Sequence, residues 1–126
     1  MKNYDNMKMY RSAFSLMLYI EEEVAKFPRY HKYSIGSEIR KMIFEIVTML
    51  AGFNENQCDK KVEIMKQILK EIEKLKIKLA LSREIKAFKS YNTWFHAAEM
   101  LYEISAQGEK LKKYFEKKKP ESKRKL

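Results

Sequence analysis

The sequence predicts an all-α protein, an antiparallel up-down-up-down four-helix bundle. Only three glycines and two prolines occur among 126 residues, so few positions force a helix to stop and the helices must be long. Leu, Met, Ala, Glu and Lys together outnumber the β-branched residues, which disfavours strands. Hydrophobic residues make up 45% of the chain, enough for one core at this length and no second domain.

The first helix is expected from about residue 6 to residue 27. Its apolar side chains alternate between spacings of three and four residues, as in a buried heptad seam: Tyr10, Ala13, Met17, Ile20, Val24 and Phe27. Glu21, Glu22 and Glu23 fall between seam positions, and we expect them on a solvated face. Pro28 ends the helix because proline disfavours the α conformation at the preceding residue.

The second helix is expected to begin after Ser34, a plausible N-cap, and to stop near Gly52. Its seam contains Ile35, Ile39, Met42, Ile46, Met49 and Phe53. The third helix follows Asp59 and is expected to continue to about Lys86. Its seam contains Met65, Ile68, Ile72, Leu75 and Leu79. Short loops between seams of similar period favour antiparallel neighbours.

The fourth helix is expected to begin after Ser90. Its seam contains Trp94, Ala98, Leu101, Ser105, Gly108, Leu111 and Phe115. Lysines then dominate, and Pro120 should break any remaining helix. We therefore expect the bundle over residues 1–116 and a basic, disordered tail over residues 117–126, because such a tail buries too little apolar surface to order itself.

Cys58 is the only cysteine, which excludes an intrachain disulfide and a zinc cluster. The polar N-terminal residues do not resemble a signal peptide, and no stretch of about 18 apolar residues could span a membrane. The expectation from these two observations is a cytoplasmic protein.

Motifs that carry catalysis are missing from the sequence. A di-iron bundle needs repeated Glu-x-x-His motifs, but His96 and Glu99 offer the reverse order once. No Gly-rich phosphate loop, nucleophile elbow or Cys–His pair occurs. We therefore expect no metal, no cofactor and no enzyme activity, with His96 at the surface or packed against an aromatic ring. Tyr91, Trp94 and Phe95 could stack on nucleic-acid bases, although aromatic residues at a helix start more often pack a core.

Charge indicates the class of partner. Twenty-seven basic and 17 acidic residues give a net charge of +10, which attracts a polyanion over a Debye length of about 8 Å at physiological salt. Nucleic acid is the leading hypothesis for that polyanion. A membrane surface, or plain solubility, would also explain the charge.

Basic residues gather in three places. Lys66, Lys70, Lys74 and Lys78 form a row on the third helix, although glutamates on or near that face make a merely solvated surface the common alternative. A second cluster lies where the third helix gives way to the fourth, and a third surrounds the first loop. The candidate phosphate contacts are Arg83, Lys86, Lys74, Lys78 and Lys89, followed by Arg29 and Arg40.

Two runs resemble a known family. Residues 27–40 read FPRYHKYSIGSEIR, and residues 79–86 read LALSREIK, followed by the segment 91–104. They resemble the accessory variability determinant proteins of diversity-generating retroelements and their four-helix-bundle relatives encoded in intervening sequences of bacterial 23S ribosomal RNA genes. The resemblance spans most of residues 8–115. It departs after Gly108, where lysines replace the Gly-Trp-rich ending that is frequent in the family.

The resemblance implies a homopentameric, barrel-like assembly with a basic surface. It also implies a non-catalytic accessory role, in which the protein binds a reverse transcriptase and template RNA or an RNA/DNA hybrid during mutagenic copying. The alternative is a structural or interaction module of the intervening-sequence type, without a reverse transcriptase partner. An iron-binding bundle enzyme is a third and weaker alternative.

Overall fold

The structure is a computed structural model that describes residues 7–56 and 58–124. Within these residues it contains helices and no strand, which confirms the all-α class. The elements are α1 (Met7–Val24), the short α2 (Arg29–Lys32), α3 (Ile35–Ala51), a 3₁₀ helix (Phe53–Glu55), α4 (Cys58–Glu84) and α5 (Tyr91–Arg124). No helix in the described part of the chain is both long and apolar enough to cross a membrane.

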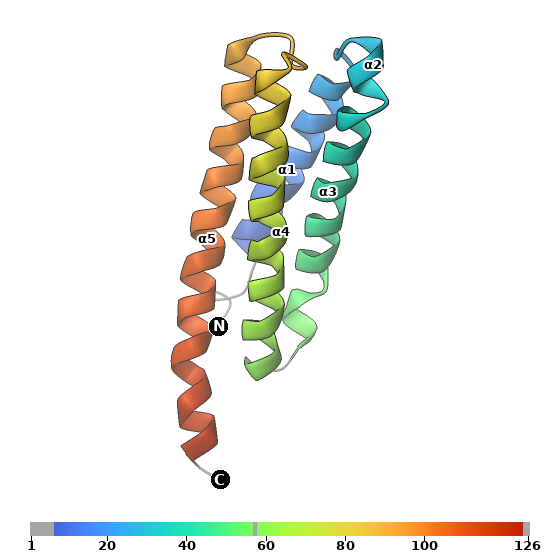
Figure 1. The fold of residues 1–126 in the computed structure, drawn as a ribbon. Coiled ribbons are helices and arrows are strands. Elements are labelled where there is room, and N and C mark those ends of the chain that lie inside the picture. The colour runs from blue at the N-terminus through green and yellow to red at the C-terminus, as the bar shows by residue number, and fades with distance from the viewer. Residues whose placement is uncertain (1–6, 57, 125–126) are drawn as a thin grey trace.

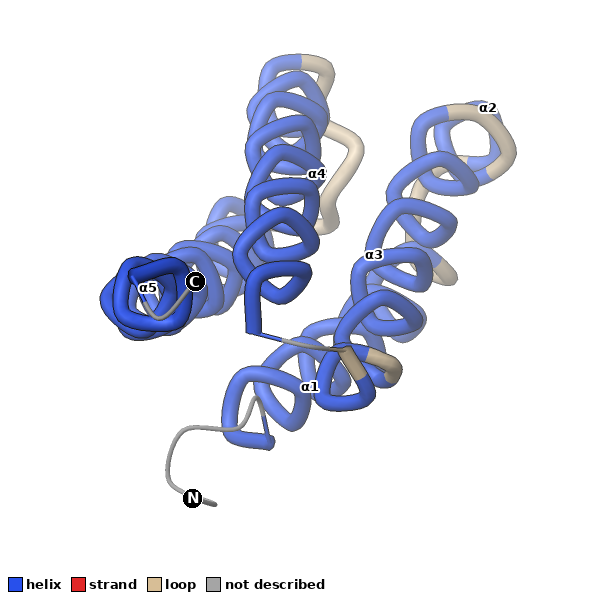
Figure 2. Tube along the Cα trace, turned by 90° about the horizontal axis from the view of Figure 1, so that it is seen from below, coloured by secondary structure: helices blue, strands red, loops and turns tan. Residues whose placement is uncertain are grey.

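The four long helices form an antiparallel bundle, with successive helices running in opposite directions (Figure 1). Each packs on two neighbours, in the cyclic order α1, α3, α4, α5 and back to α1 (Figure 2). The loop around α2 and the loop between α4 and α5 therefore lie at the same end of the bundle. Phe27 and Phe88 join these two loops, with ring centroids 4.9 Å apart.

The bundle core is apolar along its length, and the predicted seam residues are buried in it to different extents. All five predicted seam residues of α4 are buried. In α1 and α3 the predicted Tyr10, Met17, Met42 and Met49 are only half-buried, as are Trp94 and Leu111 in α5. Side chains that the seams omitted are fully buried instead: Met9, Leu16, Ile43, Leu50, Ala97 and Ile104. Each helix faces two neighbours, so its buried stripe is wider than a two-position heptad seam.

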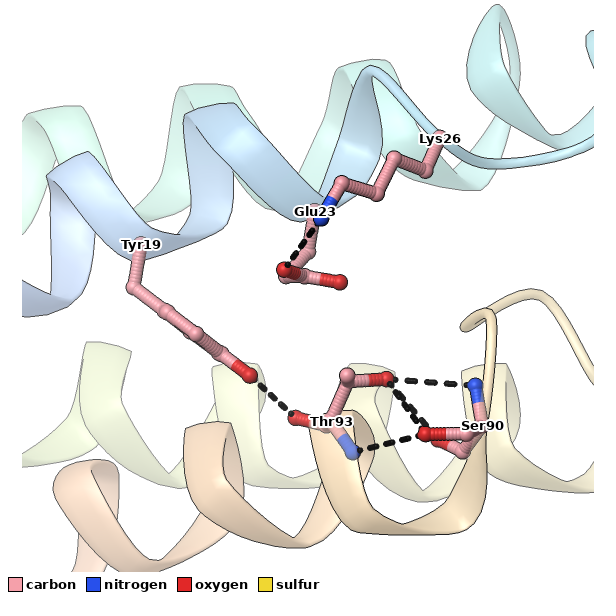
Figure 3. Close-up of polar contacts among 5 residues, drawn as sticks. All are labelled: Tyr19, Glu23, Lys26, Ser90 and Thr93. Atoms are coloured by element: carbon pink, nitrogen blue, oxygen red, sulfur yellow. Dashed lines mark hydrogen bonds and ion pairs between the residues drawn. The ribbon is translucent and has the colours of Figure 1, made fainter.

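Glu23 corrects the prediction of a solvated glutamate face. Glu21 and Glu22 are exposed, but Glu23 is only 4% exposed and accepts a hydrogen bond from Lys26 Nζ at 3.3 Å. Its carboxylate points from α1 towards the first turn of α5 (Figure 3). The reason is its spacing: Glu23 lies three residues after the buried Ile20 and four before the buried Phe27.

The predicted start after Ser34 is confirmed, but the capping role of its side chain and the predicted break at Pro120 are wrong. Ser34 does precede α3, but its hydroxyl donates backwards to the carbonyl of Tyr30 at 2.8 Å and makes no cap bond to α3. At the other end of the chain, α5 continues through Pro120 to Arg124. A proline keeps a helical φ and removes one hydrogen bond, which a solvated helix end tolerates. The backbone of residues 117–124 is thus helical, and residues 125–126 lie outside the described part.

Candidate nucleic-acid interface at the corner between α4 and α5

The end of α4 is a backbone cap without glycine. The chain leaves α4 after Glu84, two residues before the expected end at Lys86. Lys86 has φ of 58°, the only positive φ among the described non-glycine residues. Its N–H donates to the carbonyl of Arg83 at 3.0 Å, and the N–H of Ala87 donates to the carbonyl of Ser82 at 2.9 Å. These are the two bonds of a Schellman motif, whose left-handed residue is usually glycine. Lys86 therefore holds a conformation that is costly for an L-residue with a side chain.

The start of α5 is fixed from two sides, as Figure 3 shows. Ser90 and Thr93 cap the helix reciprocally: each backbone N–H donates to the other residue's hydroxyl at 3.2 Å. This confirms the predicted start after Ser90. From α1, the hydroxyl of Tyr19 donates to the carbonyl of Thr93 at 3.2 Å. Burial, followed by the charges of Glu23 and Glu22, raises the pKa of Tyr19 above its ordinary value of 10.0.

Between these two helix ends lies an open pocket of about 390 Å³. Three of its lining residues are the cations Arg83, Lys86 and Lys89, and two are aromatic residues of α5, Tyr91 and Trp94. The remaining lining residues are Ser82, Phe88 and Ser90. The structure thus brings together the basic cluster that the sequence predicted at this junction. Arg83 and Lys86 are both exposed, Arg83 in the last turn of α4 and Lys86 two residues after the helix ends.

Arg83 is oriented by two contacts. Its guanidinium carbon lies 4.9 Å from the centre of the Trp94 ring, and its Nη2 lies 3.0 Å from a carboxylate oxygen of Glu84. The Trp94 indole N–H in turn donates to the carbonyl of Leu79 at 2.9 Å. A guanidinium has five N–H donors, so these contacts leave several of them for an anion in the pocket.

One exposed aromatic ring, that of Tyr91, lines the pocket with the cations and stacks on a second exposed ring, that of Phe95. Tyr91 is 61% exposed and Phe95 is 43% exposed, and their rings stack nearly parallel, with centroids 5.9 Å apart at 18°. Trp94 is half-buried against the core. Core packing therefore explains the position of Trp94, while Tyr91 and Phe95 keep large exposed surfaces at the start of α5. All three residues were predicted from the sequence as candidates for base stacking, but the sequence does not show which of them faces solvent.

Lys74 and Lys78 do not reach this pocket. Lys74 pairs with Glu71 at 3.3 Å on the same helix, and Lys78 pairs with Glu38 of α3 at 2.7 Å. Lys66, another member of the predicted row, is also paired, because its Nζ lies 3.8 Å from a carboxylate oxygen of Glu63. The mixed face of α4 is therefore mainly a solvated surface with local ion pairs, the alternative that the sequence left open.

Arg29 and Arg40 lie elsewhere on the same half of the molecule. Arg29 is exposed on α2, at the same end of the bundle as the corner. Arg40 pairs with Glu21 of α1 at 2.8 Å and lines a separate pocket of about 320 Å³ that also contains Lys32 and Tyr33. Of the seven predicted phosphate contacts, three share the corner pocket, and two of those three, Lys86 and Lys89, have no carboxylate partner among the described residues.

No group of three or more histidine, cysteine or carboxylate side chains could hold a metal ion in the part of the chain that the structure describes. His96 packs against the ring of Tyr19, edge to face, with centroids 4.7 Å apart. The sequence predicted His96 at the surface or against an aromatic ring, and His96 is both exposed and packed against Tyr19.

Comparison with known proteins gives no further guide. The chain matches no model of a known protein family, no curated protein and no solved structure.

Proposed function

We propose that this chain is a non-catalytic nucleic-acid-binding protein that holds backbone phosphates at the corner between α4 and α5. The observation that carries the proposal is the convergence of Arg83, Lys86 and Lys89 on one pocket, two of them without a carboxylate partner among the described residues. Cations without a carboxylate partner bind phosphates without the free-energy cost of first breaking an ion pair.

The charge of the whole chain supports a polyanionic partner. The net charge of +10 steers a polyanion towards the protein, while the corner supplies the local contacts. Contacts from Arg and Lys to phosphates fix position and carry little sequence information. Any specificity for one RNA would then come from a second protein.

The resemblance to accessory variability determinants suggests which second protein that is. We propose a reverse transcriptase as the partner and its template RNA, or an RNA/DNA hybrid, as the ligand. The exposed side chains of Ile77 and Leu81 on α4 offer an apolar surface for a protein contact. In the homopentamer that the resemblance implies, five copies at +10 each would carry +50 on one body and gain avidity from linked sites.

The second candidate function is a structural or interaction module of the intervening-sequence type. The exposed apolar side chains on the outer faces of the helices favour it, since they would serve a protein partner without nucleic acid. A co-purification experiment with a reverse transcriptase encoded nearby separates the two candidates.

The test of phosphate binding is a charge-removal variant of the corner, Arg83→Gln/Lys86→Gly/Lys89→Gln. Its matched control is Lys70→Gln/Lys110→Gln/Lys113→Gln, which removes the same charge from exposed lysines elsewhere. We expect the corner variant to lose most of its affinity for a structured RNA in fluorescence anisotropy. The slope of log affinity against log salt concentration should become less negative by about 2–3. Equal binding by the corner variant and the control would refute the proposal.

A further inference from the structure

The corner has exposed aromatic rings, which phosphate binding does not require. A phosphate site needs cations and N–H donors. Tyr91, which lines the pocket with those cations, stacks nearly parallel on Phe95, and both residues are more than two-fifths exposed. Two exposed rings that lie nearly parallel offer a surface on which a ligand with a flat face can stack. A nucleobase is that ligand when the neighbouring site already holds its phosphate.

We infer that the corner selects single-stranded nucleic acid, with an unpaired base stacked on the Tyr91–Phe95 ring pair and the adjoining phosphate held by Lys86 and Lys89. This inference rests on the proposed function and narrows its ligand. The bases of a duplex are covered on both faces by their neighbours in the stack, so a protein ring can stack only on a base that is unpaired or at an end. Loops, bulges and single strands therefore bind, and continuous duplex keeps only the phosphate contacts.

The geometry around the rings suits this role. Tyr91 lies 5.4 Å from Trp94, centroid to centroid, at 44°, and Trp94 is itself fixed by its bond to Leu79. Tyr91 is thus supported on its inner side by a fixed ring while 61% of its surface stays open. Both Tyr91 and Phe95 project from the first turns of α5, whose start the Ser90–Thr93 cap makes rigid. A rigid platform loses little conformational entropy when a base stacks on it.

The protein carries its own probe for this contact. Trp94 is the only tryptophan in the chain and lines the pocket. A base that stacks on Tyr91 comes close to the indole, so saturating quenching of tryptophan fluorescence by a single strand should report binding at the corner and nowhere else.

The deciding experiment compares three RNA probes of equal length by anisotropy: a single strand, the corresponding abasic strand with the same phosphates, and a duplex. We expect the wild-type chain to prefer the single strand to the abasic strand by on the order of tenfold. The double variant Tyr91→Leu/Phe95→Leu keeps apolar volume and helix propensity, and should bind the single and abasic strands alike. Tyr30→Leu/Phe44→Leu, which replaces a more exposed tyrosine and a more exposed phenylalanine outside the corner, should retain the preference. Circular dichroism establishes that each variant is folded.

The outcomes separate this inference from the proposed function. If the wild-type chain binds the single, abasic and duplex probes equally, base stacking is refuted while phosphate binding stands. If it binds none of them, both fail. If the Tyr30/Phe44 variant loses the preference and the Tyr91/Phe95 variant keeps it, the base stacks elsewhere and the assignment to the corner is wrong.

Discussion

The guanidinium of Arg83 lies over the ring of Trp94, 4.9 Å from its centre, and so connects the last turn of α4 to the first turn of α5. The indole is held in place by its bond to the carbonyl of Leu79, one helical turn before Arg83. One aromatic side chain therefore packs against the bundle on its inner side and supports a cation of the pocket on the other. Such a cation–π contact contributes about 0.5–1 kcal/mol at an exposed site, enough to favour one direction for Arg83.

The carboxylate of Glu84 competes with a phosphate for Arg83. The pair is exposed on both sides, so breaking it costs little stability. We expect Glu84→Gln to raise the affinity for RNA about two- to fivefold at low salt, because the variant frees Arg83 and removes one negative charge from the pocket. Anisotropy titrations measure this. Glu63→Gln, which frees Lys66 on the opposite part of α4, should change affinity much less. An unchanged affinity in Glu84→Gln would show that Arg83 does not contact phosphate.

Lys86 should show opposite effects on stability and binding. Replacing it with glycine relieves the left-handed strain at φ of 58°. We expect Lys86→Gly to raise the free energy of unfolding by about 0.5–1 kcal/mol, measured by urea denaturation. The same variant should bind RNA more weakly because it loses an unpaired cation. Lys86→Ala separates charge from strain: it should weaken binding equally without stabilising the fold. A Lys86→Gly variant that is no more stable than Lys86→Ala would mean that the left-handed cap is absent.

Tyr19 should make the fold sensitive to alkaline pH. Its pKa is raised above 10.0 in the folded protein, mainly by burial. The neutral phenol therefore favours folding, a contribution that is complete below pH 10 and is lost as the pH rises through the raised pKa. Thermal unfolding measured across this range should show a decline that Tyr19→Phe reduces. Tyr30→Phe, at a ring that is 78% exposed, serves as the control and should leave the decline unchanged.

Gly36 should resist substitution although it lies in a helix. A Cβ at this position would come within 2.8 Å of Val24 Cγ1 and 3.0 Å of the carbonyl oxygen of His31. Neither neighbour can move freely, because valine is stiff and the second atom is backbone. We expect Gly36→Ala to destabilise the fold by about 1–3 kcal/mol despite its better helix propensity. Gly52→Ala, where a Cβ meets nothing within 4 Å, is the matched control and should leave urea unfolding nearly unchanged. Equal stability of the two variants would contradict the packing of α1 on α3.

Sequence patterns predicted most of the fold but less of the candidate site. The four helices and their antiparallel order follow from local periodicity and short loops, and both are confirmed in the described residues. The corner cluster was found because Arg83, Lys86 and Lys89 are neighbours in the chain. Lys78 was predicted as a phosphate contact in the row along α4. Its ion pair with Glu38, 40 residues away on α3, is one that no local pattern reveals.

The sequence by itself determined the helices, the α4 seam and the place where positive charge gathers, because each depends on residues within a few turns of one another. Only the tertiary structure decided which part of each apolar stripe faces the core, since that depends on the two neighbours of each helix. Packing also buried Glu23 between α1 and α5, and it left Tyr91 and Phe95 in solvent while Trp94 turned inward. Lys86 takes its left-handed conformation because the chain must turn from α4 into α5 there, with a lysine at the position that glycine usually occupies.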